Sequence, residues 1–386
     1  MKALAALLFL VLLVGCASAP PMPPAATLFH DELFAAPSAR IDPDAALAIS
    51  PAMRSYLADK SVSTVNRVRS TDRRRQLIDA LYRGDLKLEY DAAVTRTAAQ
   101  AFEARSGNCL ALVMMTAAFA KELGLRVRYQ AVVGDEAWDR ADDLYIAIGH
   151  VNLALEERVE PIGFFATTSS GPMIVDFLPP RDARMLHTRS IDERTVVAMY
   201  LNNRAVESLT QGQVDDAYWW AREAVQRDPE LLAAYVTLGV IYRTRHHPEL
   251  SEQVLRRVAE REPNNVFVLS NRILALRDLG RAAEAQVLAQ RLAALDPHPP
   301  FSYFREGIAA FREGRIETAR RLFAKEVARA PYHHEFEYWL AVSYMALNDA
   351  DRATIHLTRA MEVSTTRKDH DLYAGKLDRL KALRAQ

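Results

Sequence analysis

Hydrophobic residues in the middle of the chain follow two different periods, which predict a buried helix and several strands. Residues 112–123 form a long, mostly apolar run that ends at Gly124, a residue type that commonly closes helices. Residues 126–133 alternate between apolar and polar positions, as a half-buried strand does. Residues 145–155 are predicted to form another strand, and residues 171–177 a turn followed by a strand. The central part of the chain is therefore expected to combine helices with a sheet.

The C-terminal half repeats itself with a period of 34 residues. Prolines recur at three equal spacings of 34, at Pro229, Pro263, Pro297 and Pro331. Since proline cannot continue a helix, each one marks a junction between units. Small residues share one register at Ala217, Ala285, Ala319 and Ala353, and glycines share a turn register at Gly212, Gly280 and Gly314. In the turn register Asn348 replaces glycine once, and His246 interrupts the pattern.

This period and these in-phase residues resemble tetratricopeptide repeats (TPR), in which each unit is a pair of helices. From about residue 198 to the C-terminus the chain is expected to hold roughly five such repeats. A terminal helix near residues 370–384 is expected to cap the stack. The resemblance implies a concave surface that binds a peptide or a partner protein. The alternative is an array without a ligand, which acts as a rigid spacer.

The N-terminus has the pattern of an export signal. Met1-Lys2 is followed by twelve apolar residues, 3–14, which are too few to span a bilayer as a helix, since that needs about 20 residues. The next stretch, Leu13-Val14-Gly15-Cys16, resembles the bacterial lipobox, which implies cleavage before Cys16 and its lipidation. An ordinary signal, cleaved after a site such as Ala17-Ser18-Ala19, is the alternative.

The Pro-rich residues 19–26 predict an extended tether between this anchor and a folded body. Because Asp is absent at position 17, the lipobox resemblance implies the outer membrane if the cell has two membranes. With Cys16 lipidated, Cys109 is the sole thiol of the mature chain. A lone Cys cannot form an intramolecular disulfide, so Cys109 is expected to be either buried and inert or retained for its chemistry.

Charge and composition narrow the function classes. The chain has 49 Lys plus Arg and 49 Asp plus Glu among 386 residues, so a neutral net charge argues against a nucleic-acid binder. Residues 73–75 are consecutive Arg and are expected at the solvated start of a helix through Tyr82. Two Cys exclude a disulfide scaffold and a Cys-rich zinc domain.

Cys109 stands where a cysteine nucleophile would be placed. It follows Gly107-Asn108 and is predicted to lie at or near the start of the buried helix. Unpaired N–H groups and the positive end of the helix dipole favour a thiolate there and can stabilise an oxyanion. A small buried hydrophobic residue is the equally weighted alternative.

A nucleophile of this kind needs a base and a group that orients the base. His150 is predicted at the centre of the strand over 145–155, on one face with Asn152 and Ala154. Asp176 stands alone in an apolar run, where a buried carboxylate requires a partner such as a protonated His.

The order of Cys on a helix start, His on a strand and Asp on the next strand resembles the transglutaminase-like superfamily, relatives of papain-type cysteine enzymes. The matching residues are Arg105 to Cys109, then Gly149-His150, then Val175-Asp176, within about residues 86–185. The resemblance implies a catalytic Cys109–His150–Asp176 triad. Cys109 would attack an acyl carbonyl, His150 would carry the proton, and Asp176 would orient the imidazole.

Two departures from the family pattern put the substrate in doubt. Many members have an aromatic residue two positions after the His and another after the Cys, whereas this chain has Asn152 and Leu110. His187 is a weaker alternative base, expected after the last strand of the domain. The second donor to an oxyanion stays unassigned. No metal ion or organic cofactor is implied, and no acidic loop suggests calcium.

The sequence thus predicts four regions: a signal peptide (1–15), a lipidated Cys and tether (16–42), an α+β transglutaminase-like domain (43–190), and an all-α TPR solenoid (191–386). The expected function is that of a membrane-anchored, thiol-dependent acyl-transfer enzyme of the bacterial envelope, facing the periplasm. It would hydrolyse an amide or peptide rather than transamidate, with the repeats docking a protein or peptide. The alternative is a non-catalytic envelope scaffold that binds protein partners through its repeats.

Overall fold

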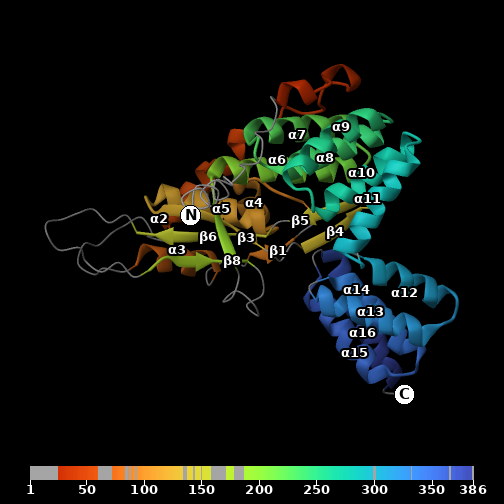
Figure 1. Cartoon of the computed structure of the whole chain (residues 1–386). Helices are drawn as coiled ribbons and strands as arrows, with labels where there is room; N and C mark the ends of the chain where they lie inside the picture. The colour runs from red at the N-terminus through yellow and green to blue at the C-terminus, as the bar shows by residue number, and fades with distance from the viewer. Residues whose placement is uncertain are drawn as a thin grey trace, which may run out of the picture.

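The computed structural model (Figure 1) describes the chain in thirteen stretches. They are residues 25–59, 72–82, 86, 88–91, 94–133, 137–141, 144–148, 150–157, 171–177, 187–298, 301–331, 333–364 and 367–384. The predicted signal peptide, Cys16 and the first part of the predicted tether lie outside the described residues. Their predicted roles are therefore untested.

The first half of the described chain contains short helices around one long apolar helix. Its helical elements are the 3-10 helices η1 (Ala25–Leu28), η2 (Asp31–Leu33) and η3 (Pro43–Leu47), and the α-helices α2 (Pro51–Asp59), α3 (Arg73–Tyr82), α4 (Ala98–Ala104) and α5 (Cys109–Glu122). The first twelve residues of α5 are all buried. A helix that is apolar on every side belongs in the interior, and α5 packs against α4 and strands β3 and β6.

Among the described residues, three small sheets accompany these helices. The main one is antiparallel, in the order β7 (Met173–Val175), β6 (Val151–Glu156), β3 (Arg126–Val133), β8 (His187–Ile191). Strands β4 (Ala137–Ala141) and β5 (Leu144–Ile148) form a separate hairpin, and β1 (Glu89–Tyr90) pairs in parallel with β2 (Ser106–Gly107). Strand β3 has the bounds that its alternating pattern predicts.

The prediction of a single strand over residues 145–155 is wrong. The chain forms β5 and β6 instead, and the two belong to different sheets. His150 directly precedes β6, and its carbonyl accepts a hydrogen bond from Val132 N at 2.9 Å. The apolar pattern continues through the break because both strands have apolar residues, so periodicity alone did not reveal where the chain changes sheet.

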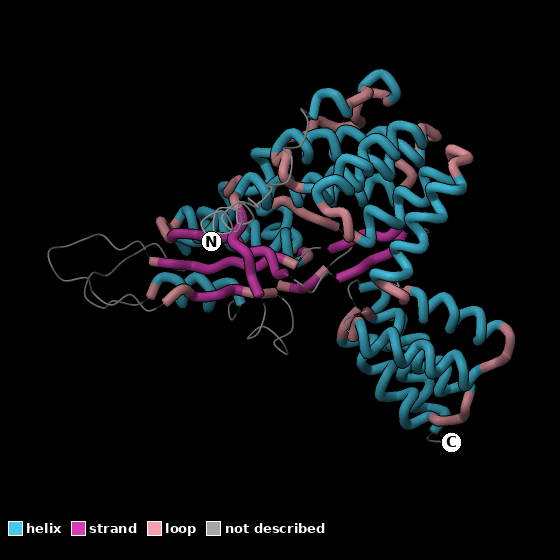
Figure 2. The backbone as a smooth tube through the Cα atoms, in the orientation of Figure 1, coloured by secondary structure: helices cyan, strands magenta, loops and turns pink. Residues whose placement is uncertain are grey.

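The second half is helical, as the 34-residue period predicts. It comprises α6 (Glu193–Thr210), α7 (Val214–Arg227), α8 (Leu232–Thr244), α9 (Pro248–Arg261), α10 (Val266–Asp278), α11 (Ala282–Leu295), α12 (Ser302–Arg312), α13 (Ile316–Arg329), α14 (His334–Ala346), α15 (Ala350–Glu362) and α16 (Arg367–Arg384). The first ten pack as five successive pairs, and α16 packs on α15 as the predicted terminal helix. Figure 2 shows this TPR-like region as helices throughout.

The turn register has one backbone conformation throughout. Gly212, Gly280 and Gly314 have φ values of 76°, 72° and 75°, in the left-handed region. Asn348 and His246 share it, with φ values of 58° and 64°. His246 therefore differs from the glycines in residue type but not in backbone conformation. Because His has a β-carbon, this left-handed conformation costs it more free energy than it costs glycine.

Close helix approach explains two further glycines in the repeats. A β-carbon at Gly307 on α12 would lie 2.6 Å from Cε1 of Phe323 on α13. A β-carbon at Gly239 on α8 would lie 2.8 Å from Cγ of Leu255 on α9. Both glycines occupy the same register two repeats apart, and both allow the two helices of a pair to touch.

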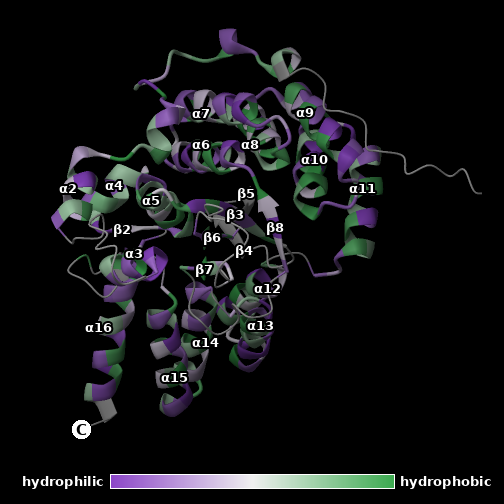
Figure 3. Ribbon diagram, turned by 90° about the vertical axis from the view of Figure 1, so that its left-hand side faces the viewer, coloured by the Kyte–Doolittle hydropathy of each residue, from purple (hydrophilic) through white to green (hydrophobic). Residues whose placement is uncertain are grey.

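The array is divided between α11 and α12. Helices α7, α9 and α13 each pack on the first helix of the next pair, but no comparable packing joins α11 to α12 among the described residues. Figure 3 shows α6–α8 on one side of the strands and α12–α15 on the other. Val287 and Leu295 of α11 are 64% and 42% exposed. Prolines at 297, 299 and 300 follow α11, and proline cannot continue a helix or donate its N–H.

Residues 28–38 of the predicted tether are packed on the first repeats. The ring of Phe34 stacks on that of Tyr218 with centroids 3.9 Å apart, and Tyr242 Oη donates to Leu28 O at 2.6 Å. Trp219 Nε1 donates to Ala35 O at 2.6 Å. In Figure 1 this red segment lies over α7 and α9. The segment therefore joins the same hydrophobic core as α5 and α6–α9.

Candidate functional site

Cys109 is the first residue of α5, as predicted. Asn108 is the N-cap, and its Oδ1 accepts a hydrogen bond from Ala111 N at 2.9 Å. Gly107 lies so close to this turn that a β-carbon there would be 2.9 Å from Ala111 Cβ. Cys109 is a free thiol and is 7% exposed. The glycine and the cap together bring β2 close to the positive end of α5.

His150 and Asp176 form a buried pair. His150 Nε2 lies 2.8 Å from Asp176 Oδ1 and 3.0 Å from Oδ2. The two side chains are 6% and 9% exposed. Asn152 Nδ2 donates to Asp176 Oδ2 at 3.0 Å, so His150, just before β6, and Asn152, within β6, both hold the carboxylate. Asp176 itself directly follows β7, which pairs with β6.

The thiol of Cys109 lies close enough to His150 to act on the pKa of its ring. Burial has the largest effect on His150 and lowers its pKa, but hydrogen bonds to Asp176 and Cys109 and the charges of both outweigh it. The pKa of His150 is thereby raised from an ordinary 6.5 to about 9. Because Nε2 faces Asp176, Nδ1 is the ring nitrogen left for the sulfur. The structure thus brings together all three residues that the sequence analysis singled out.

Tyr90 is a neighbour of Cys109 that the sequence analysis missed. Parallel pairing sets Tyr90 opposite Gly107, and Asp91 N donates to Gly107 O at 3.0 Å. Tyr90 is 39% exposed as a whole residue, and its pKa is raised above 10 first by the partial burial of the side chain, then by the charge of Cys109 and a hydrogen bond with the Cys109 side chain. A hydrogen bond from the Cys109 backbone N–H acts in the opposite direction. The Tyr90 hydroxyl therefore lies beside both the thiol and the N–H.

Other predicted features have different surroundings from those expected. His187 is the first residue of β8, opposite Val133, so it does not follow the last strand. It is exposed, and the structure brings His150 rather than His187 to Cys109.

Arg74 was expected in solvent but is 2% exposed. Its Nη1 donates to Gly171 O at 2.8 Å and its Nη2 to Asp72 Oδ2 at 2.7 Å, which compensates the buried charge.

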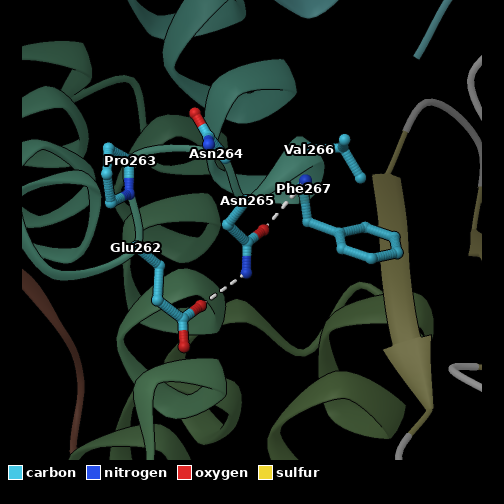
Figure 4. A pocket seen from close by; sticks show the side chains of 6 residues that line it. All are labelled: Glu262, Pro263, Asn264, Asn265, Val266 and Phe267. Carbon is cyan, nitrogen blue, oxygen red and sulfur yellow. Dashed lines mark hydrogen bonds between the residues drawn. The ribbon is translucent and has the colours of Figure 1, made fainter. Parts of the chain in front are cut away.

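A hollow at the α9–α10 turn is separate from this site. Its lining comprises Glu262, Pro263, Asn264, Asn265, Val266 and Phe267 (Figure 4). Asn265 caps α10, since its Oδ1 accepts from Phe267 N at 3.0 Å and its Nδ2 donates to Glu262 at 2.7 Å. These polar groups satisfy one another, so the hollow has the structure of a helix cap.

Neither a metal-binding cluster nor a membrane-spanning helix occurs in the described stretches. No cluster of three or more His, Cys, Asp or Glu side chains suited to a metal ion occurs among them. None of the helices there combines the length and the apolar character needed to cross a membrane.

Comparison with known proteins concerns the repeats. No protein-family model matches the chain. A curated TPR repeat-containing protein of Pseudomonas aeruginosa is 27% identical over 152 residues, 39% of this chain. The chain covers 25% of the length of that relative. The name of this relative agrees with the helix pairs and the 34-residue period of this chain.

Two solved structures are similar to this chain at a lower sequence identity. YrrB, described as a TPR protein with an unusual peptide-binding site, is 20% identical, with 47% of this chain and 92% of YrrB covered. MamA from Desulfovibrio magneticus RS-1 is 17% identical, with 45% and 96% covered. The TM-scores are 0.25 and 0.26, too low to support any conclusion about fold or function.

Proposed function

We propose that the protein docks a protein or peptide through its TPR-like repeats and carries out thiol-dependent acyl chemistry on it at Cys109. The observation that supports the chemistry is the buried contact of His150 with Asp176, together with the interaction of His150 with Cys109. The resemblance to transglutaminase-like enzymes gives these three residues the roles of nucleophile, base and orienting group. The preferred reaction is hydrolysis of an amide or peptide bond.

The proposed reaction begins with transfer of the Cys109 proton to His150, whose raised pKa favours the imidazolium. The thiolate then bonds to the carbonyl carbon, and the carbonyl oxygen becomes an oxyanion. The Cys109 N–H and the Tyr90 hydroxyl, which lie beside the thiol, are the proposed donors to this oxyanion. Collapse breaks the C–N bond, the leaving amine takes the proton from His150, and water hydrolyses the thioester with release of the acid.

In the same proposal, lipidation of Cys16 anchors the protein in the bacterial envelope, at the outer membrane facing the periplasm. Its support is the lipobox-like stretch over residues 13–16. Incorporation of labelled palmitate in bacteria, and its loss in Cys16→Ser, is the expected result. Labelling that persists in Cys16→Ser would exclude this attachment site.

A non-catalytic scaffold is the second candidate, and the comparisons favour it. The curated relative matches as a TPR protein, and binding requires no catalytic centre. Cys109 is 7% exposed, as a small buried hydrophobic residue would be. In this function the His150–Asp176 pair would be structural, and the repeats would supply the whole activity.

Alkylation of Cys109 by iodoacetamide distinguishes the two functions. The full chain would carry Cys16→Ser, which leaves Cys109 as its only thiol. For the enzyme, we expect alkylation at neutral pH that slows strongly in His150→Ala, with the rate profile displaced to higher pH. Asp176→Asn should show a smaller displacement in the same direction. Cys109→Ser sets the background.

Absence of native alkylation, or a pH profile unchanged by His150→Ala, would support the scaffold and reject the triad. Binding by the repeats would then be the function to test, by cross-linking the full chain to its partners in the envelope.

A further inference from the structure

A buried chain of hydrogen bonds links the first repeat helix to the start of α5. Glu207 of α6 accepts from Thr95 N at 2.7 Å through Oε1. Thr95 Oγ1 accepts from Asn108 Nδ2 at 2.7 Å, and Asn108 is the residue directly before Cys109. Thr95 and Asn108 are 2% and 9% exposed. The link therefore crosses from the repeats to the candidate nucleophile without passing through solvent.

Thr95 determines which way the Asn108 amide faces. Its Oγ1 receives donors from two sides, Asn108 Nδ2 and Asn203 Nδ2, the latter at 3.3 Å. With Nδ2 turned to Thr95, Asn108 Oδ1 is free to accept from Ala111 N and cap α5. A cap in this orientation leaves the Cys109 N–H directed at the site and keeps the helix end at the thiol.

Glu207 in turn fixes Thr95. The carboxylate receives Thr95 N on Oε1 and Arg204 Nη1 on Oε2, the latter at 2.7 Å. The Glu207 side chain is 16% exposed, and Arg204 and Tyr200 of the same helix are the charged and titratable groups beside it. Burial raises the pKa of Glu207, and the bonds to Thr95 and Arg204 oppose that rise. A buried donor such as Thr95 N loses a full hydrogen bond if this carboxylate is removed.

We infer that Glu207 is a positioning residue for Cys109, acting through Thr95 and Asn108, and that the first repeat thereby sets the reactivity of the thiol. This inference rests on the proposed function. It extends that function, because a partner that shifts α6 on binding would change the alkylation and acylation rates of Cys109. Helix α6 also packs directly on α5.

The test compares paired variants of Thr95 and Glu207 in the full chain carrying Cys16→Ser. Thr95→Val removes the acceptor for Asn108, and Thr95→Ser restores it. Glu207→Ala removes the acceptor for Thr95 N, and Glu207→Gln keeps an oxygen there. Glu252→Ala is the matched control, since Glu252 is a buried carboxylate of the second repeat that pairs with Arg272 at 2.9 Å.

The readout is the rate of Cys109 alkylation by iodoacetamide between pH 5 and pH 10. Thr95→Val and Glu207→Ala should be slowed about fivefold at neutral pH, the effect of losing one helix cap, with the profile displaced to higher pH. Thr95→Ser, Glu207→Gln and Glu252→Ala should match the parent. Unfolding would instead accelerate alkylation, and circular dichroism identifies it. If Thr95→Val does not fold, Glu207→Ala decides.

Each outcome counts for or against the inference. If Thr95→Val and Glu207→Ala keep the parental profile while His150→Ala is displaced, the triad stands and the link from the repeats is refuted. If Glu252→Ala is slowed equally, the effect is one of general repeat stability and the link is likewise refuted. If His150→Ala itself has no effect, the proposed function fails, whatever the Glu207 variants do.

Discussion

His150 Nε2 lies within hydrogen-bonding distance of both carboxylate oxygens of Asp176, at 2.8 and 3.0 Å, and both side chains are buried. A charged partner is what allows a buried imidazole to remain protonated. The pair therefore links the stability of the fold to pH as well as serving the proposed chemistry.

The first prediction concerns this pH dependence. The pKa of His150 is raised from 6.5 to about 9 on folding, so the folded state binds the proton more tightly. The contribution to the free energy of unfolding is fully present below pH 6.5 and is lost as the pH rises through 9. One pKa unit corresponds to about 1.4 kcal/mol, so the loss is about 3 kcal/mol. Urea unfolding from pH 6 to pH 10 should show it, and His150→Gln should flatten the curve.

The second prediction concerns Asn152, which donates to Asp176 Oδ2 at 3.0 Å. A hydrogen bond to a charged group contributes about 1.5–3 kcal/mol. Asn152 Oδ1, however, is buried and accepts no hydrogen bond among the described residues. Asn152→Leu alone therefore removes the bond to Asp176, which destabilises the fold, and also this unsatisfied oxygen, which stabilises it. A double-mutant cycle of Asn152→Leu with Asp176→Asn isolates the pair. We expect a coupling free energy above about 1 kcal/mol at pH 7; additivity would exclude the contact.

The third prediction separates two roles of Tyr90. If its hydroxyl stabilises an oxyanion, Tyr90→Phe should slow acylation of Cys109 by p-nitrophenyl acetate about 100-fold. Alkylation by iodoacetamide forms no oxyanion, so its rate should stay near that of the parent. An equal decrease in both rates would mean that Tyr90 acts on the sulfur alone. Equal rates to the parent in both assays would mean that it has no role.

Features that depend on neighbours in the sequence were predictable, whereas those that depend on distant residues were not. The place of Cys109 at the start of α5 was predictable because a Gly turn, an Asn cap and an apolar run are all local. The neighbourhood of Tyr90 was not, because β1 and β2 have two residues each and no periodicity. Arg74 was misjudged for a similar reason: its partner Gly171 lies 97 positions away.

The packing of distant parts of the chain on one another was also not predictable from the pattern of residues. Pro297 fits the 34-residue period as well as Pro263 does, yet the repeats separate after α11. The packing of residues 28–38 on α7 joins positions more than 180 apart, such as Trp219 with Ala35. A Pro-rich stretch before that segment predicted a tether, although the segment itself contains the apolar residues Leu28, Phe29, Leu33 and Phe34, which pack in the core.

The fourth prediction concerns the turn register. His246 is exposed and has φ 64°, whereas glycine occupies three of the other four equivalent positions. Because a β-carbon costs roughly 1–2 kcal/mol in this conformation and glycine loses part of that in chain entropy, His246→Gly should stabilise the repeats by up to about 1 kcal/mol. Gly212→Ala should destabilise by a similar amount. Thermal unfolding of both variants measures this; destabilisation by His246→Gly would contradict it.

The fifth prediction concerns the segment bound to the first repeats. Phe34 is 8% exposed, and its ring stacks on Tyr218 with centroids 3.9 Å apart. Removal of a buried aromatic ring costs about 3–5 kcal/mol where the surroundings cannot adjust. The rest of residues 28–38 is held by Leu28, which is 2% exposed, by the ion pair of Asp31 with Arg222 at 2.9 Å and by hydrogen bonds to α7 and α8, and all of these contacts lie on the surface of helices that have their own core. Phe34→Ala should therefore release the segment while leaving the helices folded.

Hydrogen exchange measures this release directly. In Phe34→Ala, the amides of Ala35 and Ser38, which donate to Asp215 and Asp216, should exchange at least tenfold faster, since a loss of 1.4 kcal/mol or more corresponds to that factor. Glu32→Ala is the matched control, since that side chain is 70% exposed and belongs to the same segment. Protection in Phe34→Ala equal to that in Glu32→Ala would mean that the hydrogen bonds, rather than the ring, hold the segment on the repeats.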